Sequence, residues 1–437
     1  MNALVPIVVV LDYAALSWFG KLATATGHPE AVFRVGTVLF IALNAGVLLL
    51  GPRAWGPRIP RWRAPRANSV ATRARWIAFA AIVVVAVGYR LTAIARTPLD
   101  PAEADMLPLI IAASEKLLAG GNPYERAHPF QAGIDPLGVR PASSVLASAT
   151  PDQWVAYVPA WLPALWLPYL PAVWAGVDVR LIGLSTVLLT AALLGVVRWS
   201  VETDSDRPDA RPTLGWLRLV SAGALLLAPA AVWFGAIGHT QTYWLYLTGL
   251  LWALSRRRWG LAGVGLGLSI MSRHTVLPIL PVVALFAWRC LVPRERRWLA
   301  LGAAAVVLAL VLPFGIQGLW QFTIGSPTWY MKFGDQGWNG PRWWVTHTFG
   351  FSTFLYPLGW SRAIPWVGAA LLAALYVLAY RWVHDLTSGV RHLALVLLTV
   401  QVSVPTPFRY EFFPILLVLS TLPLLAQGRR DAAVVAT

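Results

Sequence analysis

The chain has one cysteine, Cys290, and few charged residues for its 437 positions. A single cysteine excludes an internal disulfide and a metal centre built from several thiolates. Charged residues make up 12% of the sequence, hydrophobic residues make up 57%, and the mean hydropathy is +0.62. A water-soluble core cannot hold that share of apolar side chains, so the sequence predicts an integral membrane protein.

Acidic residues are also scarce, because 19 Asp and Glu stand against 35 Lys and Arg. In a soluble protein this excess would suggest nucleic-acid binding, but here the arginines lie between apolar runs, where they indicate cytoplasmic loops. The arginine-rich segments are 51–75, 256–258, 294–297 and 429–430. We therefore expect two large extracytoplasmic loops, the acidic 96–154 and the Trp-rich, Gly-rich 315–350.

Long apolar runs without the short alternation of barrel strands predict transmembrane helices. We expect an all-α polytopic bundle of about 11–13 transmembrane helices in the cell membrane, as one domain over 1–437, with further helices in its extracytoplasmic loops. The first run, 3–19, contains Asp12 and lacks a basic leader, so we interpret it as a retained span.

Two apolar segments carry interruptions. Four prolines break 157–171, and 260–291 is too long for one span and has Ser272, Arg273 and His274 in its middle. Broken backbone at membrane depth is tolerated only where it lines a protein-filled or watery cavity. Both segments are therefore candidates to enter and leave on one side, and the interruption in the second should face inward.

The segment 98–109 (PLDPAEADMLPL) gathers three carboxylates, those of Asp100, Glu103 and Asp105. Helix capping explains part of this cluster in two alternative ways. A helix that begins after Asp100 would have a capping box, whereas one capped by Asp105 would run over 106–119, with an apolar face suited to the membrane surface. Neither accounts for the whole cluster. Neighbouring carboxylates repel, which raises the pKa of one of them and suits it to proton transfer.

The segment 105–124 (DMLPLIIAASEKLLAGGNPY) resembles the first extracytoplasmic loop of the GT-C superfamily of membrane glycosyltransferases. Within it, the likeness is to the bacterial mannosyltransferases that use polyprenol-phosphate-mannose. Shorter likenesses are Tyr157-Val158-Pro159, Gly238-His239-Thr240-Gln241, Ala262-Gly263 through Arg273, and Phe408-Arg409-Tyr410. Many members carry Lys where this chain has Arg273. The resemblance implies a GT-C-like bundle and inverting transfer of a sugar, first of all mannose, from a polyprenyl-phosphate donor to a hydroxyl of a glycolipid or polysaccharide.

The resemblance also implies roles for particular residues. Asp105 is the expected catalytic base, since a hydroxyl needs one to become a nucleophile, and Glu103 would tune it or bind a sugar hydroxyl. Cationic and hydrogen-bonding groups would stabilise the leaving phosphate, and the candidates are Arg273, Arg409, His274 and Tyr410. The candidates for sugar or acceptor binding are Asn122, Tyr124, His239, Gln241, Trp343 and His347. Tryptophan is equally typical of the membrane interface, which leaves Trp343 with two interpretations.

The sequence has no Cys/His cluster, no HExxH, no Walker loop and no Rossmann glycine motif, so it predicts no protein-built zinc site and no direct use of nucleotides. A divalent cation held by Glu103 and Asp105 with the donor phosphate stays open. Two other classes also stay open. A transporter or flippase for a lipid-linked sugar would need acids at mid-membrane, where Asp12 and Glu411 are the candidates. A non-catalytic envelope-assembly subunit would leave the acidic loop unexplained.

Overall fold

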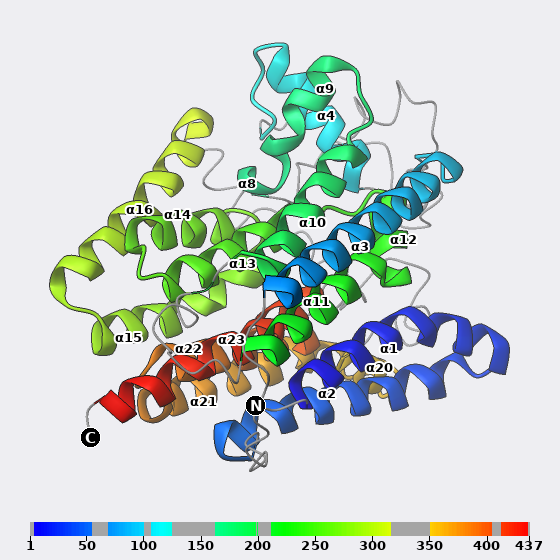
Figure 1. The fold of residues 1–437 in the computed structure, drawn as a ribbon. Coiled ribbons are helices and arrows are strands. Elements are labelled where there is room, and N and C mark those ends of the chain that lie inside the picture. The colour runs from blue at the N-terminus through cyan, green and yellow to red at the C-terminus, as the bar shows by residue number, and fades with distance from the viewer. Residues whose placement is uncertain are drawn as a thin grey trace.

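The computed structural model describes residues 4–54, 69–99, 106–124, 162–197, 199, 211–315, 350–403 and 412–435. Helices and their connections make up these ranges, and no strand occurs in them. The lower layer of Figure 1 comprises α1 (Leu4–Thr26), α2 (Pro29–Ala54), α20 (Ser352–Leu355), η6 (Ser361–Ala363), α21 (Ile364–Trp382), α22 (Leu386–Ser403) and α23 (Phe413–Val435). The middle layer comprises α3 (Ser69–Arg96), α10 (Arg180–Gly195), α11 (Arg211–Leu227), α12 (Pro229–Ile237) and α13 (Thr242–Ser255).

Two smaller groups complete the bundle in Figure 1. On the left lie α14 (Trp259–Ile270), η3 (His274–Ile279), α15 (Leu280–Cys290), α16 (Pro293–Val311) and η4 (Leu312–Phe314). At the top lie α4 (Met106–Leu118), α8 (Pro163–Trp166), η1 (Leu167–Tyr169) and α9 (Leu170–Ala175). These top elements cover the middle layer.

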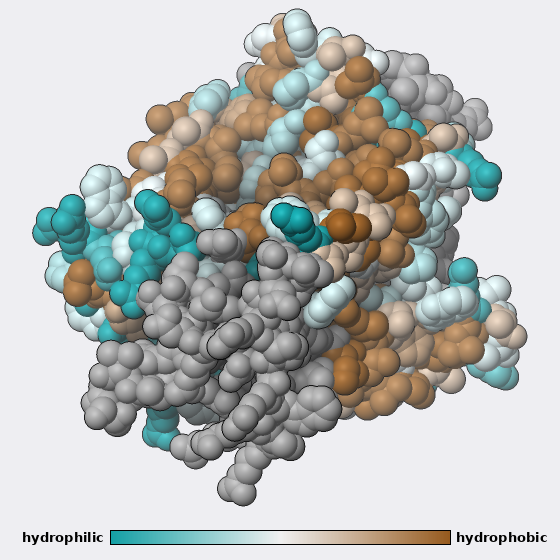
Figure 2. Space-filling model, in the orientation of Figure 1, coloured by the Kyte–Doolittle hydropathy of each residue, from teal (hydrophilic) through white to brown (hydrophobic). Residues whose placement is uncertain are grey.

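Five helices among the described residues are long and apolar enough to cross a membrane: Pro29–Leu49, Arg73–Arg96, Pro293–Phe314, Ile364–Trp382 and Leu386–Ser403. A sixth candidate is the pair Arg218–Leu227 and Pro229–Ile237, bent by 43°. Large apolar side chains such as Val84, Trp366 and Val377 are exposed, and Figure 2 shows apolar residues over much of the visible surface. These features support an α-helical polytopic membrane protein. The larger expected number of spans stays a prediction.

The helix after the acidic segment covers nearly the expected range 106–119, and the two candidate caps, Asp100 and Asp105, lie outside the described residues. α4 begins at Met106 and ends at Leu118, after which Gly120 takes φ +82° and Gly121 N donates to Lys116 O at 2.9 Å. Its apolar face is buried against protein, since Leu107 and Ile110 are no more than 2% exposed. This burial reflects packing against α9 and η1. Leu118, at the end of the same face, is 46% exposed, and a position of α4 at the membrane surface stays a prediction.

Both interrupted segments are broken in the structure. α14 has 12 residues, or about 18 Å of helix, which is shorter than the roughly 30 Å hydrocarbon core. The chain then leaves helical geometry at Arg273, which is extended (φ −146°, ψ 138°), and continues into η3 and α15. The described part of 157–171 likewise consists of the short pieces α8, η1 and the start of α9. Prolines mark the break within 157–171, and buried Ser272 and Arg273 mark the break after α14, as the sequence predicts.

Glycines fix how α14 lies against α16. A Cβ on Gly263 would overlap the Leu299 carbonyl oxygen, and a Cβ on Gly267 would lie 2.9 Å from Ala303 O. Gly263 lies against Leu299, and Gly267, four residues later, lies against Ala303, four residues after Leu299. The two helices therefore run parallel and begin at the same end of the bundle. Because α15 leads directly into α16, α14 and α15 form a broken hairpin whose tip carries Arg273.

Candidate functional site

Four parts of the chain meet near the start of α4. Ala164 N of α8 donates to Met271 O at the end of α14 at 2.9 Å, and Thr242 Oγ1 of α13 donates to Leu165 O at 3.1 Å. The turn between α12 and α13 reaches α4, because Thr240 N and Oγ1 approach Met106 Sδ at 3.2 and 3.1 Å. Residues from α4, α8, the α12–α13 turn and the hairpin tip are thus brought to one place.

Arg273 lies at this meeting point and is 7% exposed. Its Nη2 is 3.8 Å from Met106 Sδ, and its Cζ lies 4.9 Å from the centroid of the Tyr243 ring. A guanidinium stays charged in proteins and is attracted to aromatic faces. We call the set Met106, His239, Thr240, Tyr243 and Arg273 the Arg273 junction.

His239 belongs to the same junction but carries no charge at neutral pH. Burial, and then the nearby charge of Arg273, lower the pKa of His239 to about 3. Its ring also packs edge-on against Phe234, with centroids 5.4 Å apart. At pH 7 His239 is therefore a neutral imidazole beside a cation, able to donate from one ring nitrogen and accept at the other.

Gln241 and Arg90 hold the break between α11 and α12. Gln241 Nε2 donates to Ala231 O at 3.0 Å, and Gln241 is 1% exposed. Arg90 of α3 donates to the carbonyls of Leu226, Ala231 and Leu225 at 3.1, 3.3 and 3.0 Å. Pro229 and the bend leave carbonyls at the end of α11 without helical partners, and the Arg90 guanidinium satisfies them. Gln241 is predicted to bind sugar or acceptor, and its observed contact is with this break.

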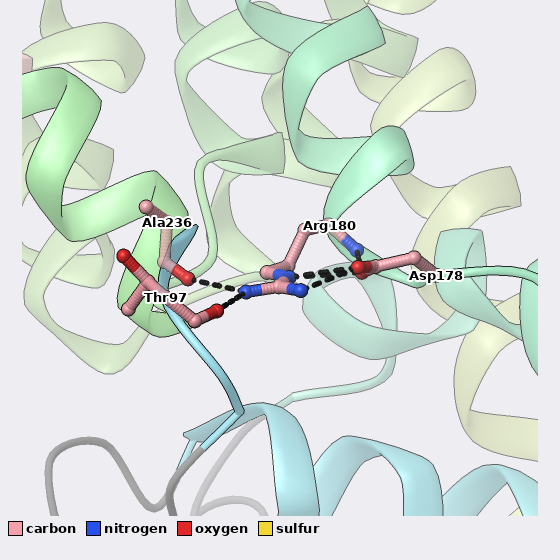
Figure 3. Close-up of polar contacts among 4 residues, drawn as sticks. All are labelled: Thr97, Asp178, Arg180 and Ala236. Carbon is pink, nitrogen blue, oxygen red and sulfur yellow. Dashed lines mark hydrogen bonds and ion pairs between the residues drawn. The ribbon is translucent and has the colours of Figure 1, made fainter. Parts of the chain in front are cut away.

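Arg180 fixes the other end of α12, as Figure 3 shows. Its Nη1 donates to Thr97 O at 2.5 Å and to Ala236 O at 2.9 Å, while Nε and Nη2 donate to the Asp178 carboxylate at 3.0 and 2.6 Å. One side chain therefore joins the segment after α3, the end of α12 and the start of α10. Because Ala236 lies three positions before His239, this clamp helps to place the α12–α13 turn.

The GGNPY segment forms a packed turn. Asn122 Oδ1 accepts from Tyr124 N at 3.0 Å, and Asn122 Nδ2 donates to Phe314 O at 3.2 Å. Tyr124 is 1% exposed, and its hydroxyl accepts from Trp166 Nε1 at 2.6 Å. The turn thus ties the end of α4 to α8 and to η4. Sugar binding by Asn122 and Tyr124 stays a prediction beside this packing role.

Several predicted site residues fall outside the described part of the chain: Glu103, Asp105, Trp343, His347, Arg409 and Tyr410. His274 is described, is half-buried and begins η3 directly after Arg273. The structure thus brings two predicted residues, Arg273 and His239, into one junction beside α4. In the described ranges no group of three or more His, Cys, Asp or Glu side chains could hold a metal ion.

Sequence reasoning missed Arg90, Arg180 and Tyr243. A signal existed for Arg90, because an ionisable side chain inside an apolar run is a functional or structural marker by default. Arg180 opens another apolar run, 180–195, and carries the same signal. Tyr243 had no such signal, since an aromatic residue in an apolar helix is ordinary. Its place under Arg273 depends on how α13 packs beside the tip of the α14–α15 hairpin.

Comparison with known proteins returned no matching family model, no matching curated protein and no matching solved structure.

Proposed function

We propose that the protein is a membrane glycosyltransferase of the GT-C type that moves a sugar, first of all mannose, from a polyprenyl-phosphate donor to a hydroxyl acceptor outside the cytoplasm. The observation that carries this proposal is the contact of Arg273 with Met106. Met106 follows Asp105 in the sequence, so a buried cation lies beside the helix that the proposed base precedes. Such a pairing suits a reaction that needs a base and a site for an anionic leaving group.

In the proposed reaction, Asp105 acts on the acceptor hydroxyl and Arg273 acts on the leaving phosphate. The acceptor oxygen attacks the anomeric carbon while Asp105 takes the hydroxyl proton. The bond from that carbon to the phosphate oxygen breaks, and its electron pair leaves with the polyprenyl phosphate. Negative charge grows on this phosphate, and a guanidinium of low exposure stabilises it more than a solvated one would. Neutral His239 adds a hydrogen-bonding group without adding a second charge.

The test is transfer of labelled mannose from polyprenyl phosphate mannose by the purified full-length protein, with glycolipid and polysaccharide acceptors. Asp105→Asn should lower turnover at least 100-fold, which is the usual contribution of a general base. Arg273→Ala should lower donor use, and Arg273→Lys should restore part of it. The matched control is Arg362→Ala, which removes an exposed arginine in η6, directly before α21. Absence of transfer with every acceptor, or equal rates in Asp105→Asn and wild type, would refute the proposal.

Asp12 favours transport of a lipid-linked sugar as a second candidate function. Its carboxyl is 1% exposed within α1, and Asn44 Nδ2 of α2 donates to its Oδ2 at 3.0 Å. Carboxyls buried among apolar helices are typical of proton-coupled carriers. Reconstituted vesicles with a fluorescent lipid-linked sugar would show movement between leaflets that Asp12→Asn abolishes. If wild type and Asp12→Asn move the lipid at the rate of protein-free vesicles, transport is excluded.

A further inference from the structure

Arginines gather at one end of the bundle, away from the Arg273 junction. α14 and α16 begin side by side at this end, which brings the turn before α14 close to the turn between α15 and α16. Hydrophilic residues form a patch at the left edge of Figure 2, over the region where Figure 1 draws α15 and the start of α16. We call six of these residues the arginine rim: Arg257, Arg258, Arg289, Arg294, Arg296 and Arg297.

Two of the rim arginines are held in place by carbonyls and aromatic rings. Arg296 donates to Leu291 O and Trp288 O at 2.8 and 2.7 Å, and its Cζ lies 5.0 Å from the Trp288 ring centroid. Arg289 donates to Val383 O at 3.2 Å and to Tyr380 O, and lies 4.8 Å from the Tyr380 ring. These contacts fix the guanidiniums and join the end of α21 to the rim.

The other four rim arginines, Arg257, Arg258, Arg294 and Arg297, are exposed. Among the described residues they make no side-chain hydrogen bond or ion pair that would neutralise them. Glu295 is the acid within the same turn, and its Oε2 accepts from Val292 N at 3.1 Å, so it caps α16. The rim therefore presents an excess of positive charge.

Exposed aromatic side chains place this charge at the depth of lipid headgroups. Trp288 is 70% exposed, Trp298 53% and Tyr380 66%, and all three lie on the helices that carry or adjoin the rim. Tryptophan and tyrosine favour the membrane interface, and arginine side chains extend toward phosphates at that level. A soluble anion would need the charge but not this aromatic border.

We propose that the arginine rim binds the headgroups of anionic phospholipids. The excess of guanidinium groups complements a headgroup with net negative charge, whereas a zwitterionic headgroup gains less from it. Basic residues at a membrane surface each add to the attraction for anionic lipid. The rim thus anchors the α14–α15 hairpin at its base, which is the part of the protein that carries Arg273 at its tip.

The test measures lipids retained by the full-length protein in mixed bilayers of phosphatidylcholine and phosphatidylglycerol, by native mass spectrometry. Wild type should retain phosphatidylglycerol preferentially. Arg294→Gln with Arg297→Gln should weaken this preference by about fivefold for each arginine removed. Arg294→Lys with Arg297→Lys keeps the charge and should keep the preference. The matched control removes two exposed arginines at the other end, Arg96→Gln with Arg362→Gln, and should retain the preference of wild type.

Three results would overturn the proposal. Wild type could retain both lipids equally, or the control pair could lose as much preference as the rim pair. Free glycerol phosphate, added at the concentration of the lipid headgroup, could displace phosphatidylglycerol fully, which would make the rim a site for soluble phosphates. Circular dichroism and thermal unfolding of each variant show that it folds before lipids are counted.

Discussion

At the scale of the residue, the Arg273 junction pairs a permanent cation with an imidazole kept neutral. The two side chains come from elements more than 30 positions apart in the chain, and both depend on burial for their properties. A protonated His239 would add like charge next to Arg273, with little water to screen it. The junction therefore holds one positive charge at neutral pH, which suits a single phosphate.

The lowered pKa of His239 predicts a dependence of stability on pH. Between pH 6.5 and about 3 the unfolded imidazole binds a proton that the folded one does not, so stability falls as pH falls through this window. The contribution is at most about 1.4 kcal/mol per pH unit. We expect His239→Asn to flatten this part of the thermal-unfolding profile in detergent. His28→Asn, at an exposed position, is the control, and equal profiles for wild type and His239→Asn would contradict the assignment.

The Arg180 clamp gives a second residue-scale prediction. Replacing Arg180 by Met keeps much of the volume but removes the guanidinium that donates to the carbonyls of Thr97 and Ala236 and to the Asp178 carboxylate. The cost should be about 1–3 kcal/mol, measured as a lower unfolding temperature. Arg180→Lys should recover only part of the lost stability, since an ammonium lacks the planar arrangement of donors of a guanidinium. A Met variant as stable as wild type would show that the clamp contributes nothing net.

At the scale of the element, the sequence indicated where helices break, but it did not indicate which residues contact the backbone at each break. Polar Ser272, Arg273 and His274 within an apolar run predicted the interruption after α14, and the prolines predicted the short pieces around α8. The partners were not predictable, because Arg90 and Arg180 bond to backbone carbonyls of distant elements, which no side-chain pattern reveals. The parallel pairing of α14 with α16 likewise depends on glycines far apart in the chain.

The glycine contact between α14 and α16 predicts contrasting effects of two alanine substitutions in one helix. A Cβ at Gly263 meets the backbone of Leu299 and Ala303, so Gly263→Ala must push the helices apart, at a cost of about 1–3 kcal/mol. Gly260 has open space around a Cβ, so Gly260→Ala should be neutral or stabilising by up to about 1 kcal/mol. Thermal unfolding of both variants measures the difference. Equal loss in the two would refute the close packing.

At the scale of the whole molecule, the bundle has two chemically different ends. The arginine rim lies at the end where α14 and α16 begin. The Arg273 junction, the Arg180 clamp and the end of α3 lie toward the other end, because α13 starts beside the junction and ends at the turn before α14. Lipid-linked substrate and acceptor would approach the junction end if the proposed function holds. From the positive-inside rule we expect the rim on the cytoplasmic side.

The difference between the two ends predicts which introduced cysteines a reagent outside the cell can label. Because Cys290 is the one native cysteine, its replacement leaves the introduced thiol as the one that reacts. In a Cys290→Ser background, Arg258→Cys and Arg297→Cys should react with a membrane-impermeant maleimide only after cells are permeabilised. Arg96→Cys and Arg362→Cys should react in intact cells, because the end of α3 and the η6 turn before α21 lie at the opposite end of the bundle. All four native side chains are exposed, so burial does not limit the reaction. Labelling of the rim positions in intact cells would invert the topology and place the Arg273 junction toward the cytoplasm, where an extracytoplasmic sugar transfer could not occur.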